Sequence, residues 1–151
     1  MVASESTLMR VLRRLLAALF LVTGALKAVD PAATAQSIAN YHLLPAPFVP
    51  VAALYVPWLE IACAFALFTS HLRRGGWLLA LVLSIAFLIF TVSALVRGLD
   101  ISCGCFGTSQ RGNLPWMALL DAVMIAISLH AVLRCARAPR DTAVRPAPRT
   151  E

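Results

Sequence analysis

Four long apolar runs, separated by short breaks, dominate the pattern of this sequence. They cover about residues 8–29, 48–69, 77–96 and 114–133. A helix needs roughly 20 predominantly apolar residues to cross the hydrocarbon core of a bilayer, and every run reaches about that length. Because polar, proline- or glycine-containing breaks separate the runs, we predict four transmembrane helices and an all-α, integral membrane four-helix bundle.

The stretch between the first two runs, residues 31–47, is too polar to cross the membrane. Its start, Asp30-Pro31, is typical of a helix N-cap followed by proline at the first helical position. A loose stripe of apolar side chains follows. We therefore expect a short helix that lies on the outer membrane surface, near the loop between the third and fourth runs.

Composition supports the membrane assignment and limits the number of domains. Of the 151 residues, 60% are hydrophobic and 13% are charged, whereas soluble domains carry about a quarter charged residues. The net charge is +6, but the basic residues form no aromatic-interleaved face, which argues against nucleic-acid binding. We predict one transmembrane domain over residues 1–135 and a disordered, basic cytoplasmic tail over residues 136–151.

The basic residues lie mostly on one side of the predicted helices, and this asymmetry predicts the orientation. Cytoplasmic segments of membrane proteins carry an excess of Lys and Arg. Ten of the 13 basic residues share one side, and they are Arg10, Arg13, Arg14, Arg73, Arg74, Arg134, Arg137, Arg140, Arg145 and Arg149. Lys27, Arg97 and Arg111 lie on the other side. We therefore expect a multi-pass protein of the cell (inner) membrane with both termini in the cytoplasm.

The first run has a second interpretation. Its arginines, followed by Leu and Ala residues, resemble the start of a secretory signal peptide. Lys27 and the length of the run favour a retained transmembrane helix instead.

The most distinctive polar motif lies between the third and fourth runs, where Cys103, Gly104, Cys105, Phe106 and Gly107 follow one another. The predicted orientation places this loop outside the cytoplasm, in a compartment where disulfides persist. A disulfide between cysteines one residue apart is tight, and Gly104 widens the backbone conformations that allow it. Tight disulfides are more easily reduced, and closing so small a loop adds little stability. The motif therefore favours thiol–disulfide exchange over a permanent crosslink.

Two other interpretations of the cysteine pair stay open. The thiols could be structural or idle, or they could hold copper(I) or zinc. A closed metal site needs further ligands, and His42 is the only histidine that we place on the same side, so we assign no metal site. Cys63 and Cys135 lie toward the cytoplasmic side, where we expect buried apolar cysteines, an inner thiol relay being the alternative.

Glu60 is predicted to lie deep in the membrane, about 18 Å along the second transmembrane helix from its outer end. A carboxylate there is costly unless it is paired, protonated or facing a polar cavity. It could be a protonated strut that hydrogen-bonds between helices, or a proton carrier coupled to thiol chemistry. Lys27 and Asp121 lie at a similar, shallower depth, and we expect these two side chains to approach each other.

Proline and tryptophan positions add two local expectations. Pro57 lies inside the second run, where it leaves a backbone carbonyl free and can kink the helix. Trp77 and Trp116 lie near the inner and outer ends of their runs, where tryptophan commonly anchors a helix at the membrane interface.

Several short motifs, taken in their order along the chain, resemble those of one family. They are Gly24-Ala-Leu-Lys27 with Asp30-Pro31, Tyr41-His-Leu-Leu-Pro45, Pro57-Trp-Leu-Glu60, and Cys103-Gly-Cys-Phe-Gly107 before Trp116 and Asp121. The chain thereby resembles the MauE family of methylamine-utilisation membrane proteins, which look related to the DoxX-like four-helix proteins. The resemblance covers roughly residues 8–133.

This resemblance implies a four-helix membrane protein tied to disulfide formation in exported partners. In the family's namesake setting the partner is the cysteine-rich small subunit of methylamine dehydrogenase, and an exported thioredoxin-like protein is another expected partner. Together with the residues, it predicts a thiol–disulfide redox protein in which Cys103, Cys105 and Glu60 carry the chemistry. The residues expected to support the site are Gly104, Phe106, Gly107, Lys27 and Asp121.

Quinone is a candidate electron acceptor by analogy with other four-helix thiol oxidases, although those enzymes usually use two cysteine pairs and this chain offers one outside. The alternative function is non-catalytic, namely an assembly or copper-delivery factor in which the same loop holds a partner or copper(I). A redox pair should cycle between oxidised and reduced states, whereas a metal or scaffold site should not.

Overall fold

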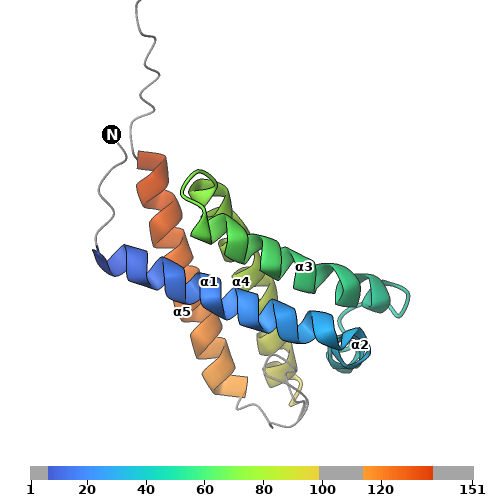
Figure 1. Cartoon of the computed structure of the whole chain (residues 1–151). Helices are drawn as coiled ribbons and strands as arrows, with labels where there is room; N and C mark the ends of the chain where they lie inside the picture. Colours follow the sequence, from blue (N-terminus) through green and yellow to red (C-terminus); the bar gives the residue numbers. More distant parts are fainter. Residues whose placement is uncertain (1–6, 99–113, 138–151) are drawn as a thin grey trace, which may run out of the picture.

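The computed structural model describes residues 7–98 and 114–137, and the segments 1–6, 99–113 and 138–151 lie outside the described part. The described residues form five helices (Figure 1), namely α1 (Thr7–Val29), α2 (Pro31–Asn40), α3 (Phe48–Phe68), α4 (Arg73–Val96) and α5 (Leu114–Arg137). No strand occurs within the two described ranges. Each predicted apolar run is therefore a helix with bounds close to those expected, and the all-α class is confirmed.

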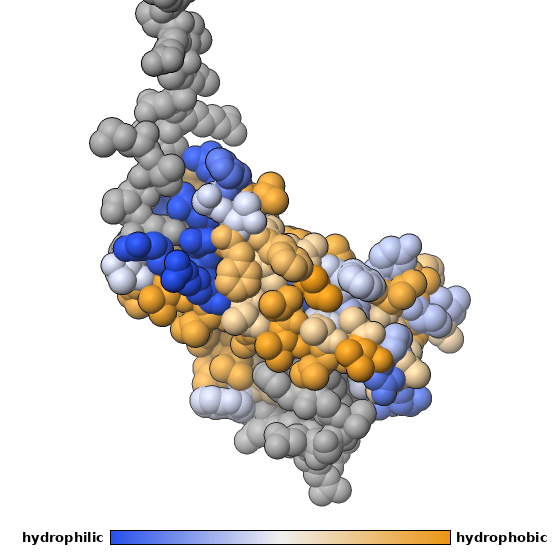
Figure 2. All heavy atoms as spheres, in the orientation of Figure 1, coloured by the Kyte–Doolittle hydropathy of each residue, from blue (hydrophilic) through white to orange (hydrophobic). Residues whose placement is uncertain are grey.

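The helices are long and apolar enough for a multi-pass membrane protein. α3, α4 and α5 each qualify as a membrane span on their own. α1 carries several basic residues and qualifies together with α2, from which it is bent by 103°. Figure 2 shows apolar side chains across the middle of the molecule and hydrophilic ones gathered at the end where α1 begins. The chain is thus a membrane helical bundle with three spans, or four with the α1–α2 pair.

The packing collects the helix ends into two groups. α1 packs mainly against α3 and α5 mainly against α4, while α3 and α4 join the two pairs (Figure 1). At one end Arg13, near the start of α1, donates a hydrogen bond to the carbonyl oxygen of Leu67, near the end of α3. We call this the arginine end. The opposite end, called the α2 end, holds the last turns of α1 and α4, the first turns of α3 and α5, and α2 (Figure 1).

Local chemistry explains where α2 begins. Oδ1 of Asp30 accepts a hydrogen bond from the backbone N–H of Ala33 at 2.9 Å, and Pro31 occupies the first helical position. A side-chain cap of this kind contributes about 1 kcal/mol. Oγ1 of Thr34 lies 3.1 Å from the carbonyl oxygen of Lys27 and 3.0 Å from that of Asp30, and these contacts hold the start of α2 against the last turn of α1. The predicted N-cap and short helix are confirmed, whereas the position of α2 on the outer membrane surface stays a prediction.

The main apolar core lies toward the arginine end. Its largest fully buried apolar side chains are those of Trp77, Phe20 and Leu67. The expectation that Trp77 anchors the helix at the membrane interface is wrong, because only 1% of this residue is exposed. α4 begins at Arg73 and not at Trp77, so the indole lies one turn inside the helix and within the apolar core. Trp116, in contrast, is 58% exposed, as an interfacial position requires.

Gly76 marks a close approach of α4 to α3. A Cβ atom at this position would lie 2.9 Å from backbone atoms of Ala66 and Leu67. Because that backbone cannot rotate away, the substitution Gly76→Ala should lower the free energy of unfolding by about 1–3 kcal/mol. The matched control is Gly75→Ala, where a Cβ atom meets nothing within 4 Å and helix propensity should raise stability by up to about 1 kcal/mol. Thermal unfolding in one detergent compares the variants, and equal midpoints would contradict this packing.

Candidate functional site

A cavity of about 160 Å³ lies inside the α2 end of the bundle. All five helices contribute side chains to its wall, and twelve of the lining residues are apolar or aromatic. The polar lining residues are Thr23, Lys27, Thr34, Ser37, Thr91 and Asp121. Ligand pockets commonly have this character, an apolar wall with a few polar groups that fix orientation. The cavity is therefore the candidate functional site.

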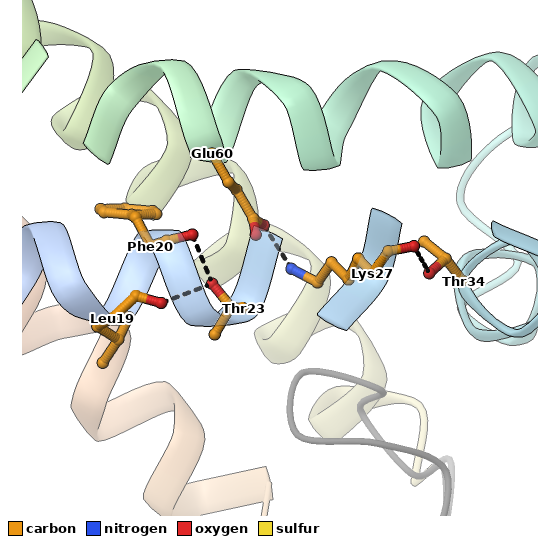
Figure 3. Close-up of polar contacts among 6 residues, drawn as sticks. All are labelled: Leu19, Phe20, Thr23, Lys27, Thr34 and Glu60. Atoms are coloured by element: carbon orange, nitrogen blue, oxygen red, sulfur yellow. Dashed lines mark hydrogen bonds and ion pairs between the residues drawn. The ribbon is translucent and has the colours of Figure 1, made fainter. Parts of the chain in front are cut away.

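Lys27 and Glu60 form an ion pair between α1 and α3 (Figure 3). Lys27 comes from the last turn of α1 and Glu60 from the middle of α3. The side chain of Glu60 is fully buried and that of Lys27 is 11% exposed. A charge inside a membrane is energetically costly unless it is paired, and here each residue compensates the charge of the other. The second carboxylate oxygen of Glu60, Oε2, has no hydrogen-bond partner within the described ranges.

A close crossing of α1 and α3 explains how Lys27 reaches Glu60. A Cβ atom at Gly24 would lie 2.9 Å from the carbonyl oxygen of Pro57 and 3.0 Å from Cβ of Glu60. Since Gly24 has no side chain, α1 can approach α3 closely enough for Lys27, three residues later, to contact the carboxylate. Lys27 and Asp121, which the sequence predicts to approach each other, do line the same cavity. The direct ion pair of Lys27 is with Glu60, a pairing that was not predicted because depth along separate helices does not show how closely they cross.

A second contact fixes the ammonium group of Lys27. Its Nζ lies 4.6 Å from the centroid of the Phe87 ring on α4, which is within the range of a cation–π interaction. Lys27 therefore links three helices. An ammonium group has three N–H donors. With one directed at Glu60, others are left for the aromatic ring and for the cavity that Lys27 lines.

Asp121 forms the opposite polar part of the wall. Oγ1 of Thr91 lies 3.1 Å from Oδ2 of Asp121 and 2.9 Å from the carbonyl oxygen of Phe87. A threonine hydroxyl has a single proton and cannot donate it to both acceptors at once. The hydroxyl therefore donates either to the carbonyl oxygen of Phe87 or to the carboxyl group of Asp121, and both arrangements hold Thr91 and Asp121 against each other on the cavity wall.

The far end of α2 is attached to the end of α4. Nη1 of Arg97, the residue after α4, lies 3.4 Å from the carbonyl oxygen of Tyr41 and 3.3 Å from that of His42. The ring of Tyr41 also packs edge-on against Phe90, with the ring centroids 5.5 Å apart. Because α2 is held at both ends, by Thr34 and by Arg97, it forms a fixed wall of the cavity.

The predicted dithiol motif lies outside the described residues. Its members, all within residues 99–113, are Cys103, Gly104, Cys105, Phe106 and Gly107. The structure does describe the two helices that this segment connects. The end of α4 and the beginning of α5 both lie at the α2 end, as the cavity does (Figure 1).

The two remaining cysteines pack away from the cavity. Cys63 on α3 is fully buried, and its thiol donates a hydrogen bond to the carbonyl oxygen of Gly76 at 3.7 Å. Cys135, near the end of α5, is partly buried, and both are free thiols. Both pack in or against the apolar core toward the arginine end. This is the environment predicted for apolar, non-reacting cysteines.

Comparison with known sequences assigns the chain to a family. The sequence model of the family described as "Methylamine utilisation protein MauE" matches residues 5–134. The chain belongs to the MauE family. The curated methylamine utilization protein MauE of Methylophilus methylotrophus is 42% identical over 72 residues, which make up 45% of this chain and 36% of that protein. No solved structure matches the chain significantly.

Sequence reasoning found part of the polar set in this MauE-family chain. Lys27, Glu60 and Asp121 were predicted to belong to the site. The structure places Lys27 and Asp121 on the cavity wall and pairs Lys27 with Glu60 from the middle of α3. Thr91 and Phe87, which contact Asp121 and Lys27, were not predicted. Thr91 could have been identified as a hydroxyl residue inside the apolar third run, at the depth expected for Asp121.

Proposed function

We propose that this MauE-family chain is a membrane thiol–disulfide redox protein that supports disulfide formation in exported proteins, methylamine dehydrogenase among them. The observation that carries the proposal is the pair Cys103 and Cys105, placed between two membrane-spanning helices and inside the stretch that matches the family. An exported thioredoxin-like or cysteine-rich protein is the proposed partner.

The proposed reaction is thiol–disulfide exchange. A thiolate of the partner attacks one sulfur of the Cys103–Cys105 disulfide and forms a mixed disulfide, while the other sulfur leaves as a thiolate. A second thiol of the partner then attacks the mixed disulfide and releases the first sulfur. The partner loses two electrons and gains a disulfide bond, and the cysteine pair gains two electrons and becomes a dithiol.

The charge distribution supports an orientation in which the α2 end faces outward. Arg10, Arg13 and Arg14 in the first turns of α1, and Arg73 and Arg74 at the start of α4, all belong to the arginine end. Cytoplasmic ends of membrane helices carry this excess of basic residues. The proposed orientation therefore has the cysteine loop outside, where an exported partner would meet it.

A second candidate function is delivery of copper(I) by the same loop. Met117 and Met124 both line the cavity, and thioethers together with thiolates prefer copper(I). Such a factor would bind the metal without cycling between dithiol and disulfide.

A gel-shift experiment with a membrane-impermeant maleimide tests the proposed function. The chain carries Cys63→Ala and Cys135→Ala, so that only Cys103 and Cys105 can react, and native membranes are labelled before and after reduction. We expect protection from labelling that reduction removes, because an outward disulfide reacts only after it is opened.

The other results would each revise the proposal. Full labelling without reduction would place the cysteines outside the cytoplasm but favour copper(I) binding or idle thiols. Added copper(I) distinguishes these two, because it protects the thiols from labelling only if they bind the metal. A lack of labelling under both conditions would contradict the outward orientation.

A further inference from the structure

We infer that the cavity at the α2 end binds the ring of a lipid-soluble quinone, which accepts the electrons that the cysteine pair takes from its partner. The inference deepens the proposed function and rests on it for the source of the electrons. The part of the inference that concerns binding of the ring depends only on the cavity and not on the proposed function.

The cavity has the size and lining of a site for one ring. Its volume is about 160 Å³, and an apolar cavity of about 150 Å³ is known to hold benzene. Phe20, Tyr41, Phe87 and Phe90 contribute to the wall, and aromatic side chains pack favourably against a second ring. A volume of this size accommodates one substituted ring but neither a peptide segment nor a whole lipid.

The same cavity is placed to receive its ligand from the bilayer. Leu19 on α1 and Leu120 on α5 line the cavity and are also 37% and 40% exposed on the surface of the bundle. α1 and α5 make few contacts with each other, since each packs mainly against a different helix. A lipid-soluble ring can therefore enter between α1 and α5 while its apolar tail stays in the membrane.

The polar groups select a quinone over a plain hydrocarbon. A quinone has two carbonyl oxygens on opposite sides of its ring, and both are hydrogen-bond acceptors. The cavity wall carries two groups on different helices that can donate to these oxygens, the Lys27 ammonium group and the Asp121 carboxyl group. In the proposed complex Asp121 is protonated and donates its single proton to the quinone, while the Thr91 hydroxyl donates to the carbonyl oxygen of Phe87. If a lipid acyl chain filled the cavity, both groups would lack a hydrogen-bond acceptor there, and a buried polar group without a partner is energetically costly.

Electrons and protons balance between the dithiol and the quinone, so the proposed reaction needs no further reactant. Oxidation of the Cys103–Cys105 dithiol to a disulfide releases two electrons and two protons, and reduction of a quinone to a quinol takes up two of each. Lys27 and Asp121 each donate a proton to one carbonyl oxygen, and the two protons from the thiols restore them. Glu60, paired with Lys27, stabilises the charged ammonium between turnovers.

Binding is tested in a chain that cannot carry out thiol chemistry. The full chain with Cys103→Ser and Cys105→Ser is placed in lipid nanodiscs and titrated with ubiquinone bearing one isoprene unit, followed by quenching of tryptophan fluorescence. We expect saturable binding that Ala52→Phe weakens at least about tenfold, because the new ring fills the cavity. The matched control is Leu54→Phe, on the exposed face of the same helix, which should leave the Kd unchanged.

A second probe tests whether the oxygens are recognised. An alkylbenzene with the same isoprene tail lacks both carbonyl groups, and it should bind at least about tenfold more weakly than the quinone. Equal binding of the two probes would overturn the inference, since the cavity would then accept any apolar ring. Equal Kd values for Ala52→Phe and Leu54→Phe would overturn it as well.

Asp121→Asn separates proton donation from binding in the chain with native cysteines. The amide keeps the shape and the contact with Thr91 but has no acidic proton, so the Kd should change by less than about threefold while reduction of quinone by the reduced dithiol slows about 100-fold. An unchanged rate would contradict the role of Asp121. Quinone that binds the cysteine-free chain but is never reduced by the native one would leave the ring site standing and contradict the proposed thiol function.

Discussion

Replacement of Glu60 by Leu should lower the free energy of unfolding by about 3 kcal/mol, because Lys27 would then lack the carboxylate that compensates its charge inside the bundle. For a chain of this length, a loss of that size corresponds to a decrease in the unfolding midpoint of about 10 °C. Thermal unfolding of the purified protein in a mild detergent measures the change.

A double variant distinguishes the ion pair from the loss of packing. Lys27→Met combined with Glu60→Leu removes both charges and keeps comparable side-chain volumes, so it should recover most of the stability that Glu60→Leu loses. If the double variant were as unstable as the single one, packing of the Glu60 side chain and not its charge would be the source of the loss.

Single substitutions Cys103→Ser and Cys105→Ser should each abolish disulfide formation in the exported partner, to the level of cells that lack this protein. Two-electron exchange needs both sulfurs, since one forms the mixed disulfide and the other completes the disulfide of the pair. The single thiol that each variant keeps can attack only a partner that already carries a disulfide, so a mixed disulfide should form when the variant is incubated with the oxidised partner. Non-reducing gels after alkylation of free thiols measure both the partner's oxidation and the trapped complex.

The remaining cysteines supply the matched controls. Cys63→Ala and Cys135→Ala should leave oxidation of the partner unchanged, because both thiols pack toward the arginine end and away from the cavity. Normal oxidation of the partner in both serine variants would contradict the exchange mechanism. It would favour the alternative assembly factor, in which the loop holds a partner without redox cycling.

The pattern of apolar residues predicted most of the fold of this MauE-family chain. The four runs became α1, α3, α4 and α5, because a segment of about 20 apolar residues in a bilayer must satisfy its backbone hydrogen bonds as a helix. The start of α2 was equally predictable from the sequence, since the cap at Asp30 is a local interaction among neighbouring residues. These features depend on short-range chemistry, which the sequence expresses directly.

Only the ionisable residues of the described site could be predicted from the sequence. Lys27, Glu60 and Asp121 were recognisable as ionisable residues in apolar runs, because charges in a membrane require a compensating environment. Their partners were not recognisable: Lys27 pairs with Glu60, and Thr91 contacts Asp121. The error for Trp77 has the same origin, since its burial depends on which neighbouring helices face it.

The sequence by itself determined that this is an all-helical membrane protein with a Cys-Gly-Cys motif between its last two helices. It also determined which residues carry charge in the bundle. Only the tertiary structure decided that Gly24 lets α1 cross α3 closely enough to pair Lys27 with Glu60, and that α2 forms a wall of a cavity lined by all five helices. The physical reason is that helix formation is governed by neighbouring residues, whereas crossing angles and cavities depend on contacts between helices far apart in the chain.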